Sequence, residues 1–158
     1  MLRIGLISDT HDLLRPEALA AMRGVDRILH AGDICGGTVL DGLATIAPVA
    51  AVRGNNDRGA WAERLPVDAT VEFEGVRIHV VHDIATMALD PRAAGIGVVI
   101  SGHSHRPSIA TRDGVLHVNP GSAGPRRFSL PIAMAELTIE GGTVAARIIA
   151  LGSQSNVA

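Results

Sequence analysis

Aromatic residues and cysteine are scarce in this 158-residue sequence, and lysine is missing altogether. With 2% aromatic residues, the core must consist of Val, Ile, Leu and Ala, which does not suit a base-stacking platform. The single cysteine, Cys35, excludes a disulfide framework, so we expect a reducing, cytoplasmic setting. All 14 basic residues are arginine and the formal net charge is −2, so we expect no nucleic-acid partner.

Long apolar runs are also missing. No stretch approaches the length that crosses a bilayer, and the apolar run at the N-terminus is too short for a secretory signal. We therefore expect a soluble protein that makes no membrane contact. The content of 47% hydrophobic and 19% charged residues fits one globular domain, expected over 1–151, followed by a small polar tail at 152–158.

Predicted strands and helices alternate in the first half of the chain. Strands are predicted at 1–7, 27–31 and 49–52, with helices at 13–23 and 38–46 between them. Such alternation is typical of a parallel sheet with crossover helices. The second half carries three hairpin signals, at 74–75, 113–114 and 141–142, which join strands at 69–73 and 76–81, 108–112 and 115–118, and 132–139 and 143–151.

A further buried strand is predicted at 97–100, after a short helix at 90–94. We therefore predict one α/β domain with a parallel half and a largely antiparallel half.

Seven side chains that could bind a metal stand at the ends of five predicted strands. They are Asp9, His11, Asp33, Asn55, His82, His103 and His105. In open α/β sheets ligands bind at the carboxyl ends of strands. Two octahedral cations need about this many carboxylate, amide and imidazole donors if one carboxylate bridges and water fills the remaining positions. The spacing of His103 and His105 lets both rings face one site, each towards a different metal.

The ordered set Asp9-x-His11, Gly32-Asp33, Gly54-Asn55-x-Asp57, His82 and Gly102-His103-x-His105 resembles the calcineurin-like metallophosphoesterase superfamily. Asn119-Pro-Gly-Ser122 with Pro125-Arg126 resembles the C-terminal part of its small, single-domain prokaryotic phosphodiesterase branch. The resemblance implies a four-layer α/β/β/α sandwich of two facing mixed sheets flanked by helices. It also implies that one metal is held by Asp9, His11, Asp33 and His105, and the other by Asp33, Asn55, His82 and His103, with Asp33 bridging.

The expected activity is hydrolysis of a small phosphodiester by in-line attack of a hydroxide that bridges two divalent metals. Manganese is the first expectation, and Fe, Ni, Co, Zn and Mg are alternatives, because mixed nitrogen and oxygen donors do not select one metal. The alternative functions are a phosphomonoesterase or nucleotide phosphatase, a non-catalytic scaffold such as the retromer subunit of this fold, and a mononuclear or structural metal protein. The exposed hairpins could pair subunits into a homodimer or homotetramer.

The sequence departs from the family pattern at Asn56, where many members have a histidine that is thought to protonate the leaving group. An amide cannot be a general acid, so we predict a preference for diesters with acidic leaving groups. Asp57 is expected either to orient a neighbouring ligand or to be a plain turn residue.

Asp12 and Asp83 replace the usual glycine after a ligand histidine. Their carboxylates would either bring negative charge near an anionic substrate and restrict the backbone, or point outwards or cap the following helix, which is our expectation. Because Asp83 departs from the family pattern directly after His82, His79 is the alternative metal ligand at this position.

Several polar residues near these motifs are weaker candidates for binding the substrate or taking part in catalysis. Arg53, Arg126 and Arg127 could bind phosphate oxygens, and Arg126 joins Asp33, Asn55, Asn56 and Asp57 as a catalytic candidate. Residues 119–122 could present backbone N–H groups to a phosphate or form only a turn. For His30, His117 and Cys35 we expect packed, structural roles.

Overall fold

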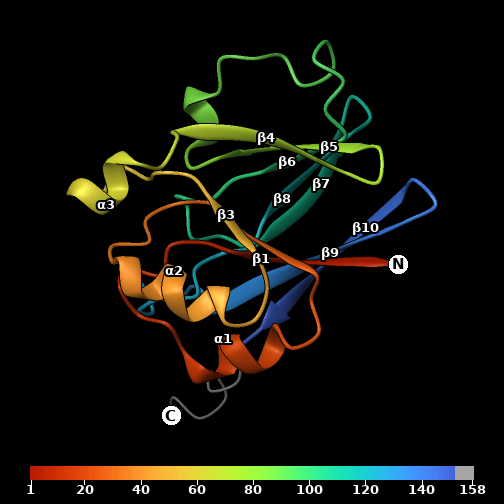
Figure 1. Cartoon of the computed structure of the whole chain (residues 1–158). Coiled ribbons are helices and arrows are strands. Elements are labelled where there is room, and N and C mark those ends of the chain that lie inside the picture. Colours follow the sequence, from red (N-terminus) through yellow and green to blue (C-terminus); the bar gives the residue numbers. More distant parts are fainter. Residues whose placement is uncertain (152–158) are drawn as a thin grey trace.

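The computed structural model describes residues 1–151, and the predicted tail at 152–158 lies outside these residues. Two five-stranded mixed sheets face each other (Figure 1). The first sheet has the order β10 (Thr143–Ala150), β9 (Ala133–Glu140), β1 (Leu2–Ile7), β2 (Arg27–His30), β3 (Val49–Ala51). The second has the order β4 (Asp68–Phe73), β5 (Val76–Val81), β6 (Val98–Ile100), β8 (Val115–Asn119), β7 (Ser108–Arg112).

Each sheet has three parallel strands. In the first sheet β1, β2 and β3 are parallel, and β9 runs antiparallel to β1 and β10. In the second sheet β5, β6 and β8 are parallel, and β4 and β7 are antiparallel additions at the two edges. The expectation of a largely antiparallel second half is confirmed, since β4–β5, β7–β8, β9–β10 and β1–β9 are antiparallel pairs. Only β5–β6 and β6–β8 are parallel there, and the last hairpin joins the first sheet.

The main core lies between the sheets, where period-two alternation turns apolar side chains inward. Ile4 and Leu6 of β1 and Leu137 of β9 pack there against Ile78 of β5 and Ile100 of β6. On the outer face of the first sheet, α1 (Pro16–Ala21) and α2 (Gly37–Ala44) enclose a second apolar cluster. Helix α1 begins later than predicted because Arg15, which precedes Pro16, is extended (φ −71°, ψ 138°).

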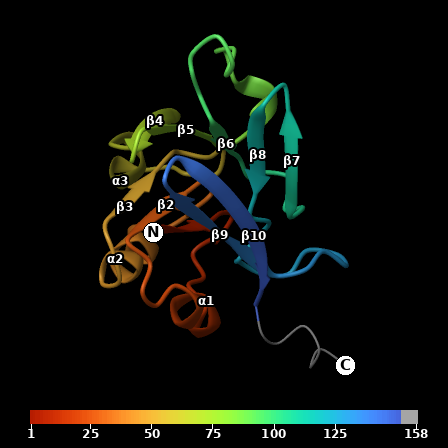
Figure 2. The same ribbon diagram turned by 90° about the vertical axis from the view of Figure 1, so that its right-hand side faces the viewer.

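The outer face of the second sheet is covered by the segment between β5 and β6, which projects away from α1 (Figure 2). Its only regular element among the described residues is a 3₁₀ turn, η1 (Ile84–Thr86). Met87, Leu89 and Ala94 of this segment pack on Val99 and Val115. The two facing sheets and the α/β sandwich are thus confirmed, with a loop as the fourth layer.

The prediction of a helix at 90–94 was wrong, because residues 91–95 form a turn. The Asp90 carboxylate accepts a hydrogen bond from the Arg92 N–H, and Gly95 adopts a left-handed conformation with φ 72°. Conversely, the four-residue helix α3 (Ala60–Glu63) was not predicted. Within residues 1–151, no helix has the length and apolar composition that crossing a bilayer requires.

Candidate metal centre

The loops that follow β1, β2, β5 and β6 meet at one end of the sandwich and are joined by backbone hydrogen bonds. The N–H groups of Asp9 and His11 donate to the carbonyl oxygens of Gly32 and Asp33, each at 3.0 Å. The Gly102 N–H donates to the His82 carbonyl oxygen at 2.9 Å. These bonds join the loops within each sheet. Across the sheets, the His103 N–H donates to Asp9 Oδ2 at 3.1 Å and His82 Nδ1 lies 2.8 Å from the Ala31 carbonyl oxygen, so the four loops share one framework.

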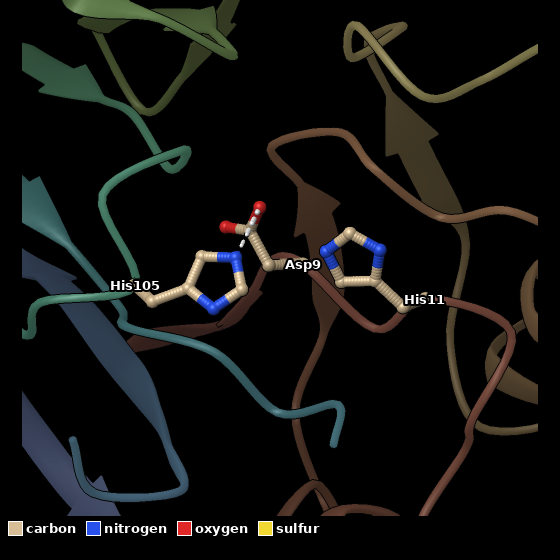
Figure 3. Close-up of side chains that lie close together, drawn as sticks. All are labelled: Asp9, His11 and His105. Carbon is tan, nitrogen blue, oxygen red and sulfur yellow. Dashed lines mark ion pairs between the residues drawn. The ribbon is translucent and has the colours of Figure 1, made fainter. Parts of the chain in front are cut away.

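Asp9, His11 and His105 form one group of donor atoms, all within 4.8 Å of one another. In Figure 3 the His105 ring faces the Asp9 carboxylate, and His105 Nε2 lies 3.3 Å from Asp9 Oδ1. Asp9 is fully buried, and its Oδ2 accepts hydrogen bonds from Ser8 Oγ (2.7 Å) and the His103 N–H (3.1 Å). Its Oδ1 has no hydrogen-bond partner and is left to face the histidines.

Asp9, Asp33 and His82 form a second group with the same close spacing. His82 Nε2 lies 3.4 Å from Asp33 Oδ2 and 3.9 Å from Asp9 Oδ1. His82 Nδ1 lies 2.8 Å from the Ala31 carbonyl oxygen, so Nδ1 carries the proton and Nε2 presents its lone pair to the carboxylates. His79, the alternative, lies elsewhere: its Nδ1 is 2.9 Å from Thr70 Oγ1 on the outer face of the second sheet.

Asp33 stands between the two groups, with Oδ2 3.8 Å from His11 Nε2 and 3.4 Å from His82 Nε2. Asn56 donates to it twice, from its N–H to Oδ1 (2.9 Å) and from Nδ2 to Oδ2 (2.8 Å). Burial alone would raise the pKa of Asp33, but the nearby His82 ring and the two hydrogen bonds from Asn56 outweigh burial and hold the pKa below its ordinary range. Asp33 is therefore a carboxylate that is oriented by Asn56.

The buried polar atoms of this region fit a bound divalent cation. Among the described residues, six buried side-chain nitrogen or oxygen atoms have no hydrogen-bond partner, and four of them are here: Asp9 Oδ1, His11 Nε2, His82 Nε2 and His105 Nδ1. An unpaired buried polar atom costs about 1–3 kcal/mol, and three of these four, all but His105 Nδ1, are the atoms that face the other donors, so they call for an external partner. Burial also raises the pKa of Asp9, which a neighbouring cation would reverse.

The loops around these donors are held in left-handed backbone conformations. Ten non-glycine residues of the described chain have a positive φ, and seven of them lie here: Asp9, His11, Asp12, Asp33, Cys35, His103 and His105. Their φ angles lie between 45° and 70°. Asp and His tolerate this region better than most residues, yet such conformations cluster where function requires a particular side-chain direction.

Asp57 ties together the loops after β2 and β3. Its carboxylate accepts hydrogen bonds from the N–H groups of Gly54 and Cys35, each at 2.8 Å. Gly54 in turn packs so tightly against Asp33 that a Cβ would overlap its backbone nitrogen and Oδ1. Asp57 thus fixes the backbone on which Asp33 sits, and among the described residues it belongs to neither donor group.

His103 lies outside both donor groups, and Asn55 and His103 line a hollow of about 220 Å³. Arg53, Val67, His82, Asp83 and Thr86 also line this hollow. The His103 side chain is 48% exposed, and its Nε2 lies 3.8 Å from Asp83 Oδ2. Asp83 also caps η1 by accepting the Ala85 N–H at 3.0 Å, which is one of the roles expected for it.

Arg126 lines a second hollow, of about 300 Å³, together with His11, His105, Pro125 and Arg127. The predicted site residues are therefore brought to one end of the molecule, where Asp9, His11, Asp33, His82 and His105 form the donor groups. Asn55, His103 and Arg126 lie beside them.

The supporting residues were largely missed from the sequence. Ser8 binds Asp9 Oδ2, and Ser122 Oγ donates to the Asp9 carbonyl oxygen at 3.0 Å. Asn119 Nδ2 donates to the Gly102 carbonyl oxygen at 3.0 Å, so segment 119–122 braces the loops. A lone Ser or Asn carries no spacing signal, and only the fold brings these residues next to Asp9 and Gly102.

Cys35 and His117 are both partly buried, which fits the packed, structural roles expected for them. Burial, with the nearby carboxylates of Asp57 and Asp33, raises the pKa of the Cys35 thiol to about 11. His117 lies on β8, two strands from His79, and burial lowers its pKa.

Known proteins share this fold and much of this sequence. The model of the calcineurin-like phosphoesterase superfamily domain matches residues 2–142. A probable metallophosphoesterase from Methanothermobacter thermautotrophicus is 38% identical, and the match covers 95% of this chain and 93% of that protein. Among solved structures, an archaeal phosphodiesterase has a TM-score of 0.78 at 23% identity, covering 94% of this chain and all of the other.

Vps29 from Chaetomium thermophilum also has this fold, with a TM-score of 0.76 at 20% identity over 94% of this chain and 95% of its own. The family match, the 38% identical relative and the converging donor groups agree with one another. The chain belongs to the calcineurin-like phosphoesterase superfamily, a metal-dependent family of hydrolases.

Proposed function

We propose that this protein hydrolyses phosphodiesters with a pair of divalent metal ions. The observation that carries the proposal is the position of Asp33, whose Oδ2 faces His11 on one side and His82 on the other. A buried carboxylate that lies within 4 Å of a histidine from each donor group is the feature that a two-metal phosphoesterase needs. A mononuclear or purely structural site does not need it.

One metal would be held by Asp9, His11, Asp33 and His105, and the other by Asp33, His82, Asn55 and His103. Asn55 and His103, which would complete the second set, line the hollow beside His82. Two bound divalent cations, with manganese our first expectation and Fe, Ni, Co, Zn or Mg as alternatives, would supply a hydroxide nucleophile at neutral pH and neutralise charge on the phosphoryl oxygens.

The surrounding residues position these donors and bear on the choice of leaving group. The Ala31 carbonyl fixes the His82 ring, and Asn56 orients Asp33 through two hydrogen bonds. Because the Asn56 amide already donates to Asp33 and cannot be a general acid, it cannot protonate a departing alkoxide. Diesters with acidic leaving groups, such as aryl esters, should therefore be cleaved faster than diesters with alkyl groups only.

A diester is favoured over a monoester because hollows lie beside both donor groups, one next to His11 and His105 and one next to His82 and His103. They offer space for two substituents on one phosphorus. The similarity to an archaeal phosphodiesterase points the same way. The scaffold alternative has the Vps29 structures in its favour, but this chain keeps all seven candidate donors.

The test is hydrolysis of bis(4-nitrophenyl) phosphate, the monoester 4-nitrophenyl phosphate and an alkyl-only diester by metal-stripped protein, with and without added Mn²⁺. We expect Mn²⁺-dependent cleavage, fastest for the aryl diester. The substitution Asp33→Asn should lower this rate roughly 100-fold or more, because it removes a shared anionic ligand from both metals.

Asp113→Asn is the matched control, since Asp113 has nearly the same φ (51° against 55° for Asp33) but lies in the β7–β8 turn. Its rate should equal that of the wild type. If no substrate of the panel were hydrolysed with any of the candidate metals, the scaffold function would replace this proposal.

A further inference from the structure

The hollow beside His11 and His105 is bounded by the loop between Gly124 and Ile132, and both ends of this loop are bonded to the rest of the fold. The Arg15 guanidinium donates to the Gly124 carbonyl oxygen at 3.2 and 3.4 Å, and the Gly124 N–H donates to Ser122 Oγ at 3.3 Å. Beyond the loop, Ile132 pairs with Ser122 in an isolated β-bridge. The chain thus leaves and rejoins the fold at one place, and the exposed residues Arg126 and Arg127 are held next to the donor histidines.

These two arginines carry charge that the protein itself does not neutralise. Within residues 1–151, neither guanidinium has an ion pair or a hydrogen bond, and none of the residues that line this hollow is acidic. By contrast, Arg3 and Arg147 both pair with Glu136.

The hollow beside His82 and His103 has a different charge from the hollow beside His11 and His105, because an acidic residue lines it. Arg53 and Asp83 both line it, so a cation and an anion are present together, and Val67 and Gly54 add apolar surface. The Asp83 carboxylate faces His103 at 3.8 Å. An anionic group would be repelled by Asp83 there, whereas it would meet two unpaired guanidinium groups in the other hollow.

We propose that the substrate is an unsymmetrical phosphodiester, one of whose substituents carries a second negative charge that binds Arg126 and Arg127. The other substituent is uncharged and occupies the hollow beside His82 and His103. A guanidinium fork suits a carboxylate or a phosphate, and both supply the anionic oxygens that this hollow lacks. This inference rests on the proposed phosphodiesterase function and names the class of substrate for it.

Two isosteric diesters test the inference. Both are 4-nitrophenyl esters, and the second aryl group carries a para carboxylate in one and a para carboxamide in the other, so that they differ in charge alone. For the wild type with Mn²⁺ we expect kcat/KM to be about tenfold higher for the carboxylate, since two nearby cations each contribute on the order of a threefold preference at an exposed site. A third diester with a phosphonomethyl group distinguishes phosphate from carboxylate recognition.

The preference should fall to about one in the double variant Arg126→Gln/Arg127→Gln and should shrink as salt screens the charges. Arg112→Gln, which removes a charge from β7 on the second sheet, should keep the wild-type preference. Equal kcat/KM for the two isosteric diesters in the wild type, or an unchanged preference in the double variant, would overturn this inference and leave the phosphodiesterase function standing. Hydrolysis of neither diester would overturn both.

Discussion

His30 connects the first two donor loops although it belongs to neither donor group of the described residues. It is fully buried; its Nδ1 accepts the Gly32 N–H at 3.1 Å, and its Nε2 lies 3.1 Å from Thr10 Oγ1. The Thr10 hydroxyl donates in turn to the Ile34 carbonyl oxygen at 3.1 Å. Since Nδ1 accepts, the neutral ring must donate from Nε2, and a second proton would break the bond to Gly32.

Burial lowers the pKa of His30 to about 3, from an ordinary value near 6.5. Between these two pKa values the unfolded chain binds a proton at His30 that the folded state does not bind. The contribution of neutral His30 to the unfolding free energy is therefore complete above pH 6.5 and is lost as the pH falls towards 3. Between pH 6.5 and 5 the wild type should lose about 2 kcal/mol of unfolding free energy through His30.

His30→Gln retains one acceptor and one donor but cannot titrate. In urea unfolding of metal-stripped protein at pH 7.5 and pH 5.0, its loss of stability should be smaller than that of the wild type by this amount. The same pH dependence in both proteins would show that folding does not shift the pKa of His30.

At the scale of single elements, the donor loops are short, left-handed and tightly packed. Gly102, which precedes His103 and His105, lies so close to the first loop that a Cβ would overlap Ser8 Oγ and approach Asp9 Oδ2 to 2.7 Å. A side chain at this position would push the loop after β6 away from the loop after β1. The approach of His105 to Asp9 therefore depends on the missing side chain.

Gly102→Ala should lower the unfolding free energy by about 1–3 kcal/mol and weaken Mn²⁺ binding, because either Ser8 or the 102–105 loop must shift. Gly97→Ala is the matched control: it directly precedes the same strand, and its added Cβ would lie at ordinary distances of 3.5 Å from Val76 and 3.8 Å from Arg77. Thermal unfolding with and without Mn²⁺ compares the two. A Gly102→Ala protein that matched Gly97→Ala in both readings would contradict the close packing described here.

Elements with strong local signals could be predicted from the sequence. The three hairpins lie where Glu74-Gly75, Asp113-Gly114 and Gly141-Gly142 place two left-handed residues in each turn. The four-residue helix α3 is too short for periodicity to reveal. The helix predicted at 90–94 was wrong because Pro91 and Gly95 enclose only one turn, which the Asp90 carboxylate and packing on Val99 stabilise as a loop.

For the whole molecule, the prediction of converging donors depended on strand ends, and the structure brings those of β1, β2, β5 and β6 together. Asp9, Asp33 and His82 lie together, as expected from the sequence, because each lies within three residues of the C-terminal end of one of these parallel strands. The partition of hairpins between the two sheets was not predicted, since it depends on contacts between residues distant in the chain. The bracing by Ser8, Asn119 and Ser122 was missed for the same reason.

The central claim is that Asp33 joins two metal sites into one centre, and the number of metal ions bound per chain tests it most directly. Metal-stripped wild type should bind two Mn²⁺ ions per chain in a calorimetric titration, and Asp113→Asn should do the same. Asp33→Asn should bind at most one, held by Asp9, His11 and His105. A wild type that binds a single ion, or an Asp33→Asn protein that still binds two with unchanged affinity, would contradict the account.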